Sequence, residues 1–323
     1  MKGICFDGVS PVFREDLPVP QAYEGHSRIR ILCANVCSTD KEVAKGYRPD
    51  FRGIMGHEFA GIVDASVSRP DLIGKPVVGE LNEGCGHCFY CRNGLEKHCA
   101  DRKVIGLDGR DGCFAEYMVL ADHLLHVIPE GLSPETAVFC EPLAAALEIC
   151  EQYPVTPGLH TALIGDGRLA YMIAQVLHLK KADLTVIGKH PEKLAMFAPF
   201  AKLRRLEDCG NTAAYRGKEQ EEYTYELVVD ASGNAGGLRL AGEIVRRRGT
   251  VILKSTYAGD APINLSSFVV NEVTITGSRC GPFEPALDLL AKGLVRFPEI
   301  EWHELSDFQA AFASKAFKAG FRM

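Results

Sequence analysis

From residue 161 to residue 253, short apolar runs alternate with helical stretches, and this alternation restricts the fold more than any other feature. The apolar runs are 161–165, 184–187, 227–230 and 250–253. The helical stretches are 168–179, 193–197 and 238–247. Apolar strands joined by helical crossovers are typical of a parallel sheet that is covered on both faces. We therefore expect a doubly wound α/β domain here.

A glycine-rich turn follows the first of these strands. Gly165-Asp166-Gly167-Arg168-Leu169-Ala170 matches the pattern G-x-G-x-x-G/A. Glycines at such a turn let backbone N–H groups and the helix N-terminus approach a pyrophosphate. The alternative is an unrelated glycine-rich turn, which the strand–turn–helix context disfavours. The sequence thus predicts a dinucleotide site that includes Gly165, Gly167, Arg168 and Leu169.

The end of the second strand bears on which dinucleotide binds. An acidic residue about 20 positions past the glycines usually holds a free ribose 2′-hydroxyl. This chain has Gly188 there, followed by Lys189 and His190, with Lys193 one turn later. Positive charge suits a 2′-phosphate, so we expect these four residues to bind the cofactor and NADP to be favoured over NAD. The alternative is a solvated basic helix start.

Four cysteines occur in the spacing C-x2-C-x2-C-x7-C, within a stretch that has no helical or strand period. They are Cys85, Cys88, Cys91 and Cys99. Four thiolates bind Zn²⁺ tetrahedrally and can order a segment that has few apolar residues. An iron–sulfur cluster is the alternative, but such runs usually continue x3-C-P, whereas Ala100 follows Cys99. We predict a structural zinc lobe over residues 82–102.

A second set of possible metal ligands lies outside this lobe. It comprises Cys37, His57, Glu58 and Glu141. One thiolate, one imidazole and one or two carboxylates are suitable zinc ligands, and three such ligands with an open position describe a catalytic site. Each residue alone has a structural explanation, for example burial of the thiol or helix capping by Glu141. Their occurrence together beside a dinucleotide fold indicates a metal site.

The overall composition excludes several partners. The chain has 323 residues, 46% of them hydrophobic, which suffices for about two domains. A formal charge of −6 without a basic stripe argues against nucleic acid or an anionic membrane as a partner. No apolar signal segment follows Met1, so we expect a cytoplasmic protein. The 12 cysteines then remain reduced, without disulfides.

Together, the motifs resemble the zinc-containing medium-chain dehydrogenases, the alcohol dehydrogenase superfamily. The motifs are C-S-T-D at 37–40, G-H-E-F-A-G at 56–61, the four cysteines, G-C-F-A-E-Y at 112–117, E-P-L at 141–143 and G-x-G at 165–167. The resemblance implies a β-rich GroES-like catalytic domain over 1–153, a Rossmann domain over 154–281 and a return to the catalytic domain over 282–323. It also implies a homodimer or homotetramer.

The same resemblance implies the chemistry of the site. Cys37, His57 and either Glu58 or Glu141 would hold a catalytic zinc, and the four cysteines a structural one. The catalytic ion would act as a Lewis acid on an alcohol oxygen while hydride passes to a nicotinamide. Thr39 matches the hydroxyl that passes the proton outward, and Asp40 would orient the site.

The identity of Glu141 bears on the substrate. Simple-alcohol enzymes of the superfamily have a cysteine there, so this chain looks more like the polyol, sugar and L-threonine dehydrogenase branches. We expect a secondary alcohol with a neighbouring hydroxyl or amino group. The alternatives are a simple-alcohol or aldehyde dehydrogenase, a zinc-free quinone or enoyl reductase, and a non-catalytic dinucleotide-binding redox sensor that uses thiols such as Cys113 and Cys140.

Overall fold

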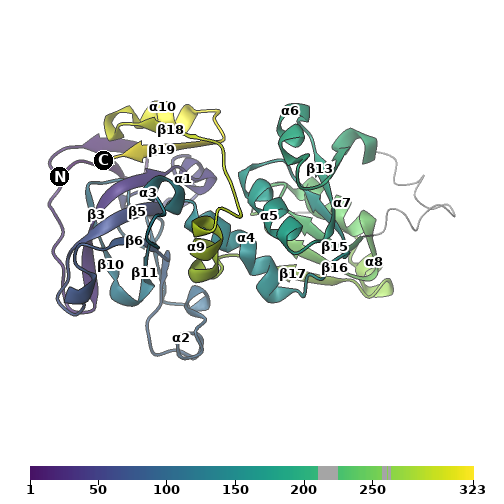
Figure 1. Cartoon of the computed structure of the whole chain (residues 1–323), viewed down its shortest axis with the longest axis horizontal. Coiled ribbons are helices and arrows are strands. Elements are labelled where there is room, and N and C mark those ends of the chain that lie inside the picture. Colours follow the sequence, from purple (N-terminus) through teal and green to yellow (C-terminus); the bar gives the residue numbers. More distant parts are fainter. Residues whose placement is uncertain (210–224, 257–259, 261–262) are drawn as a thin grey trace. The chain divides into compact units, whose positions relative to one another are not determined.

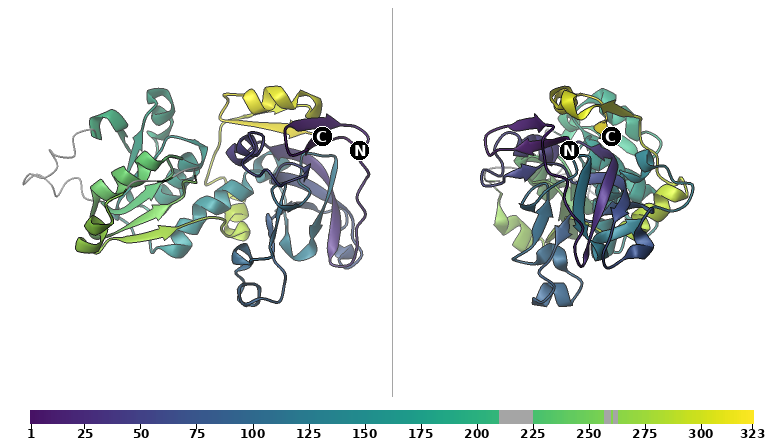
Figure 2. Two further views of the ribbon diagram at one scale, coloured as in Figure 1. Left: turned by 180° about the vertical axis from the view of Figure 1, so that it is seen from behind. Right: turned by 90° about the vertical axis from the view of Figure 1, so that its left-hand side faces the viewer.

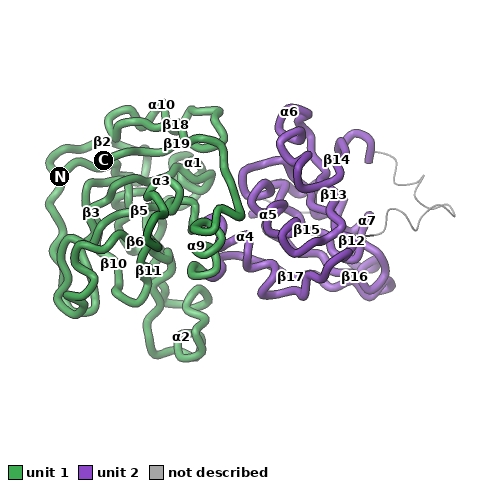
Figure 3. The backbone as a smooth tube through the Cα atoms, in the orientation of Figure 1, with its two compact units in different colours: residues 1–141, 283–323 green, residues 142–282 purple. Residues whose placement is uncertain are grey.

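The computed structural model describes residues 1–209, 225–256, 260 and 263–323. They form two compact units, Met1–Glu141 with Phe283–Met323, and Pro142–Pro282 (Figure 3). Both chain termini therefore lie in the first unit. The predicted boundary after residue 153 falls one helix later than this division, and the domain boundaries stay predictions. None of the helices formed by the described residues is long and apolar enough to cross a membrane.

The first unit is built on a seven-stranded sheet in the order β11-β6-β5-β3-β19-β18, with β10 also paired to β3. Its strands are β3 (His26–Asn35), β5 (Glu58–Ala65), β6 (Pro76–Gly79), β10 (Tyr117–Ala121), β11 (Leu125–Val127), β18 (Ile300–His303) and β19 (Lys318–Arg322). The C-terminal strand β19 pairs antiparallel with β3, which places the last residues of the chain in the sheet formed by the N-terminal segment (Figure 1).

Two three-stranded sheets and five α-helices, with short 3-10 turns, complete the first unit. One sheet has the order β2-β1-β4, and the other has the order β7-β8-β9. Their strands are β1 (Gly3–Phe6), β2 (Pro11–Arg14), β4 (Gly53–Ile54), β7 (Asn82–Glu83), β8 (Lys103–Ile105) and β9 (Gly109–Arg110). The helices are α1 (Ser38–Val43), α2 (Phe89–Arg92), α3 (Pro134–Ala137), α9 (Phe283–Ala291) and α10 (Phe308–Ala313). The lobe that carries α2 projects away from the sheets in each view (Figures 1 and 2).

The second unit contains a six-stranded parallel sheet in the order β14-β13-β12-β15-β16-β17. Its strands are β12 (His160–Ile164), β13 (Asp183–Gly188), β14 (Lys202–Arg205), β15 (Tyr225–Asp230), β16 (Val245–Leu253) and β17 (Thr274–Gly277). The helices are α4 (Cys140–Gln152), which begins in the first unit, α5 (Arg168–Leu179), α6 (Pro191–Leu194), α7 (Ala235–Ile244) and α8 (Leu265–Val270). Read along the chain, the strand order is 3-2-1-4-5-6, the doubly wound order of dinucleotide-binding folds. The predicted α/β class is confirmed.

Local capping explains where element boundaries differ from the prediction. The helix expected over 238–247 begins earlier because the Asn234 side chain accepts a hydrogen bond from the N–H of Gly236. It also ends earlier, since Val245 already starts β16. In the first unit β5 ends at Ala65, and the Ser66 hydroxyl then accepts a hydrogen bond from the N–H of Arg69.

A buried lysine ties three segments of the second unit together. Lys254 follows β16, and its Nζ donates to the carbonyl oxygens of Ala145 (2.6 Å) and Arg279 (2.7 Å) and to the hydroxyl of Ser278 (3.2 Å). We expect Lys254→Met to lower the free energy of unfolding by about 3 kcal/mol, because buried acceptors lose their donor. Urea unfolding followed by circular dichroism measures this.

The matched control is Lys202→Met, which removes a lysine that is exposed on β14 and pairs with Asp183 at 2.8 Å. Exposed pairs contribute about 0–1 kcal/mol, so this variant should unfold close to the wild type. Equal midpoints for the two variants would contradict the structural role of Lys254.

Candidate metal centres and nucleotide site

Cys37, His57 and Glu58 bring one ligand atom each to within 4.8 Å of one another. The register of the main sheet explains this: Asn35 at the end of β3 pairs with Glu58 at the start of β5. Cys37 leaves β3 two residues later, and His57 enters β5 one residue earlier. His57 and Glu58 are buried, and Cys37 is half-buried. A thiolate, an imidazole and a carboxylate that converge in this way form a donor set suited to zinc.

Gly56 determines how the chain enters this cluster. Its φ is +92°, in the region that side chains rarely adopt, and a Cβ atom here would lie 2.3 Å from the ring of Phe114. Phe114 is fully buried and packs edge-on against Phe321 of β19, with ring centroids 4.9 Å apart. The core of the first unit therefore fixes the backbone directly before His57.

Asp40 supports two of the three candidate ligands from behind. It is fully buried in α1, its Oδ2 accepts from the N–H of Cys37 (2.7 Å), and its Oδ1 lies 3.2 Å from His57 Nδ1. Burial lowers the pKa of His57, but Asp40 and Cys37 outweigh that effect and hold the pKa well above its ordinary value. Asp40 therefore places negative charge beside the Nδ1 side of the imidazole, which suits a site for a cation.

Glu58 has a charged partner that comes from the C-terminus. Lys318, the first residue of β19, places its Nζ 2.6 Å from Oε2 and 2.8 Å from Oε1 of Glu58, and both side chains are buried. The Sγ–H of Cys113, also buried, donates to the carbonyl oxygen of Glu58 (3.6 Å). The Glu58 carboxylate is therefore held in place by Lys318 where it meets Cys37 and His57.

The other predicted catalytic residues lie at different distances from this cluster. Thr39 is close, because its Oγ1 accepts from Cys37 Sγ at 3.7 Å. Glu141 lies in the first turn of α4. Among the described residues, its carboxylate does not belong to the group of ligand atoms formed by Cys37, His57 and Glu58. The choice between Glu58 and Glu141 as a metal ligand stays a prediction.

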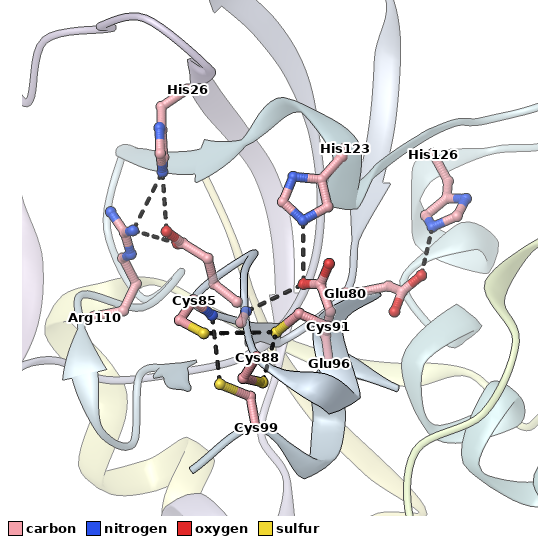
Figure 4. A network of polar contacts seen from close by, with 12 residues as sticks. His26, Glu80, Cys85, Cys88, Cys91, Glu96, Cys99, Arg110, His123 and His126 are labelled. Carbon is pink, nitrogen blue, oxygen red and sulfur yellow. Dashed lines mark hydrogen bonds and ion pairs between the residues drawn. The ribbon is translucent and has the colours of Figure 1, made fainter. Parts of the chain in front are cut away.

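The four cysteines of the projecting lobe also gather. Their ligand atoms lie within 4.8 Å of one another, with Cys88 Sγ 3.5 Å and Cys85 Sγ 4.0 Å from Cys91 Sγ (Figure 4). Cys99 Sγ accepts from the N–H of Cys85 at 3.4 Å. Four sulfurs placed tetrahedrally at about 2.3 Å from a zinc ion are about 3.8 Å apart, so the arrangement fits this ion.

Polar contacts join the lobe to the rest of the first unit (Figure 4). Oε2 of Glu96 accepts from the N–H of Gly84 (3.1 Å) and lies 3.2 Å from His123 Nε2. Glu83 pairs with Arg110 and lies 3.1 Å from His26 Nε2. Glu83 is thereby held against strands β3 and β9, and Glu96 against the segment between β10 and β11.

The glycine-rich turn of the second unit lies between β12 and α5. Gly165 has φ +127°, and a Cβ atom there would lie 2.5 Å from the carbonyl oxygen of Ala231. A Cβ atom at Gly167, directly before α5, would meet no atom within 4 Å, so this side of the turn is open. Arg168 and Leu169 form the first turn of α5. The structure therefore places these four predicted residues together on one turn.

The predicted 2′-phosphate residues lie beside this turn because β12 and β13 pair in parallel, with Ile164 opposite Ile187. Gly188 ends β13, Lys189 and His190 follow, and Lys193 is exposed on α6. Asp166, which was not predicted as a site residue, points toward the loop that follows β13. Its Oδ2 accepts from the N–H groups of Lys189 and His190, both at 2.7 Å.

Comparison with known proteins shows which dehydrogenases the chain is similar to. Residues 23–130 match the alcohol dehydrogenase GroES-like domain. The chain is 24% identical to sorbitol dehydrogenase of Halalkalibacterium halodurans, over 95% of this chain and 92% of that protein. It is 27% identical to D-arabitol-phosphate dehydrogenase of Enterococcus avium, over 90% and 89%. The solved structure of alcohol dehydrogenase TADH from Thermus sp. ATN1 is 26% identical, has a TM-score of 0.89 and covers 100% of each chain. Over nearly its whole length, the chain is similar to medium-chain alcohol dehydrogenases.

Two residues at the candidate sites were missed in the sequence. Lys318 carries no local signal, since it lies 260 positions from Glu58 and reaches it only through the pairing of β19 with β3. Asp166 occupies the variable position of G-x-G, where an acid directly between the two glycines is the signal that could have been used. The thiols proposed for a redox sensor are buried, and the Sγ–H of Cys140 donates to the carbonyl oxygen of Phe283 (3.6 Å).

Proposed function

We propose that this dehydrogenase transfers hydride between a secondary alcohol of the polyol, sugar or amino-alcohol class and a nicotinamide dinucleotide. The observation that carries the proposal is the buried convergence of Cys37, His57 and Glu58 in front of Asp40. The relatives named as sorbitol and D-arabitol-phosphate dehydrogenases support the polyol class. A simple-alcohol substrate is the alternative within the same family.

Each residue near the cluster has a distinct role in this proposal. Cys37 and His57, with Glu58 or Glu141, hold a zinc ion, which supplies Lewis-acid polarisation of the alcohol oxygen when bound. Thr39, beside the Cys37 thiol, accepts the alcohol proton at its Oγ1 and passes its own proton outward. Asp40 keeps the Nδ1 side of His57 occupied and so presents Nε2.

The four lobe cysteines hold a second zinc ion in this proposal. Its role is structural, because four thiolates leave no position open for a substrate. The ion would order the segment between β7 and β8, whose only regular elements are α2 and a short 3-10 turn.

The cofactor lies at the turn between β12 and α5. Gly165, Gly167, Arg168 and Leu169 contact its pyrophosphate through backbone N–H groups and the start of α5. Gly188, Lys189, His190 and Lys193 lie where the adenosine ribose is bound in this fold. The positive charge of the basic residues, taken alone, favours NADP(H) over NAD(H), whereas the carboxylate of Asp166 acts in the opposite direction.

A substrate panel tests the proposal. Zinc-loaded protein is assayed for nicotinamide reduction with polyols, sugars, amino alcohols and simple alcohols, each with NAD⁺ and NADP⁺. We expect kcat/KM for a vicinal diol or amino alcohol to exceed that for simple alcohols by about tenfold or more, since a site built for a second polar group discriminates against its absence. Preference for simple alcohols would favour the alternative substrate class, and silence across the panel would contradict the proposal.

A further inference from the structure

The loop between β13 and α6 is held by a carboxylate from the neighbouring turn. Oδ2 of Asp166 accepts from the N–H groups of Lys189 and His190 at 2.7 Å each, and His190 Nδ1 lies 3.1 Å away. The Asp166 side chain is only 11% exposed, although it belongs to a glycine-rich turn. Burial raises the pKa of Asp166, but the hydrogen bonds from His190 and Lys189 outweigh it and hold the pKa below its ordinary value. The group is therefore an anion at neutral pH.

The Asp166 carboxylate occupies space that a side chain at position 188 would need. A Cβ atom at Gly188 would lie 2.9 Å from Asp166 Cβ and 3.0 Å from Asp166 Oδ2. In dinucleotide-binding folds an acid at the end of the second strand accepts a hydrogen bond from the adenosine ribose. Here that strand ends in glycine, and the missing side chain leaves room for Asp166. The acid thus reaches the ribose position from the G-x-G turn.

This arrangement disfavours a 2′-phosphate in two ways. First, the N–H groups of Lys189 and His190, which could bind an anion, already donate to Asp166. Second, unit charges at 4 Å repel by about 4 kcal/mol at an effective dielectric constant of 20. Lys189 and Lys193 are exposed, and exposed ion pairs contribute about 0–1 kcal/mol each. The repulsion therefore outweighs the attraction of the surface lysines.

We propose that Asp166 selects the cofactor: its carboxylate accepts from the ribose hydroxyl of NAD(H) and excludes the 2′-phosphate of NADP(H). Oδ1 has acceptor capacity for this role, because its single contact is with His190 Nδ1 at 3.2 Å among the described residues. The inference rests on the proposed function in that it needs a nicotinamide dinucleotide at this turn. It reverses the preference for NADP that the basic residues predict by themselves.

Binding of two cofactor fragments tests this selection without turnover. Isothermal titration measures ADP-ribose and 2′-phospho-ADP-ribose on the full chain and on Asp166→Ser, which removes the charge and frees the N–H groups. We expect the wild type to bind ADP-ribose about tenfold more tightly or better, and Asp166→Ser to shift the ratio toward the 2′-phosphate by about a hundredfold. Asp166→Asn, which keeps an acceptor but loses the charge, should shift it by about tenfold.

Glu192→Gln is the matched control, because Glu192 is an exposed acid in the first turn of α6, three residues past Lys189. If this variant shifts the ratio as far as Asp166→Ser does, general charge and not Asp166 sets the preference. A wild type that prefers the 2′-phosphate fragment, or an Asp166→Ser variant that weakens both fragments equally, would overturn the inference. Absence of binding by both fragments would overturn the site and the inference with it.

The same variants separate this inference from the proposed reaction. Fragment selectivity that depends on Asp166, in a protein that oxidises no alcohol of the panel, would uphold the cofactor assignment and reject the reaction. Turnover by the wild type with NADP⁺ preferred to NAD⁺ would uphold the reaction and reject the role of Asp166.

Discussion

Replacement of Cys37 by serine is expected to lower kcat/KM for alcohol oxidation by about a thousandfold or more, and His57→Ala should do the same. Both side chains belong to the buried cluster that fits a catalytic zinc ion. Lewis-acid stabilisation is worth several kcal/mol, and about 4 kcal/mol corresponds to a thousandfold in rate. Steady-state kinetics with the best substrate and cofactor of the panel measures the loss.

The control for this experiment is Cys33→Ala, which removes a buried thiol from β3 four residues before Cys37. Cys33 lies outside both metal clusters of the described chain, so its replacement should leave kcat/KM within about threefold of the wild type, a change below 1 kcal/mol. Circular dichroism of each variant shows whether the fold is retained. A folded Cys37→Ser enzyme that keeps a tenth of the wild-type activity would contradict the role of the cluster.

The largest stability effect is expected from Lys318→Met. The ion pair between Lys318 and Glu58 is buried, with contacts of 2.6 and 2.8 Å. Removing one partner of such a pair leaves an uncompensated charge and costs about 3–5 kcal/mol. We expect this decrease in the free energy of unfolding, measured by urea denaturation.

A double variant tests whether the uncompensated charge is the cause. Adding Glu58→Gln to Lys318→Met removes the charge and should restore about half of the lost stability or more. Lys45→Met serves as the surface control, because the Lys45–Glu42 pair is exposed and should contribute about 0–1 kcal/mol. If Lys318→Met behaves like Lys45→Met, the buried pair does not stabilise the unit.

Sequence patterns predicted the strands that are buried on both faces. The run at 227–230 lies within β15, where all four residues are buried, so its apolar composition reflects its environment. The edge strand β14 (Lys202–Arg205) was not predicted. Three of its four residues are basic and none of the four is buried, so the strand has no apolar run. An edge strand needs only one neighbour, and its sequence need not be apolar.

The residues of the candidate site also differ in how far they could be predicted: those in short sequence motifs could be, whereas those brought together by the fold could not. Cys37, His57 and the four lobe cysteines stand in short motifs whose spacing is limited by metal geometry, so they could be picked out along the chain. Lys318 could not be, since only the pairing of the last strand with β3 brings it to Glu58. Asp166 was missed because the pattern was read for its glycines, while the contacts of the residue between them depend on the neighbouring loop.

Native mass spectrometry of the purified protein counts the zinc ions that its two cysteine-containing clusters bind. We expect two zinc ions per chain in the wild type, one in Cys37→Ser and one in Cys99→Ser, because each variant loses a ligand of a different cluster. A Cys37→Ser protein that binds as much zinc as the wild type would contradict the assignment of Cys37, His57 and Glu58 as a metal site.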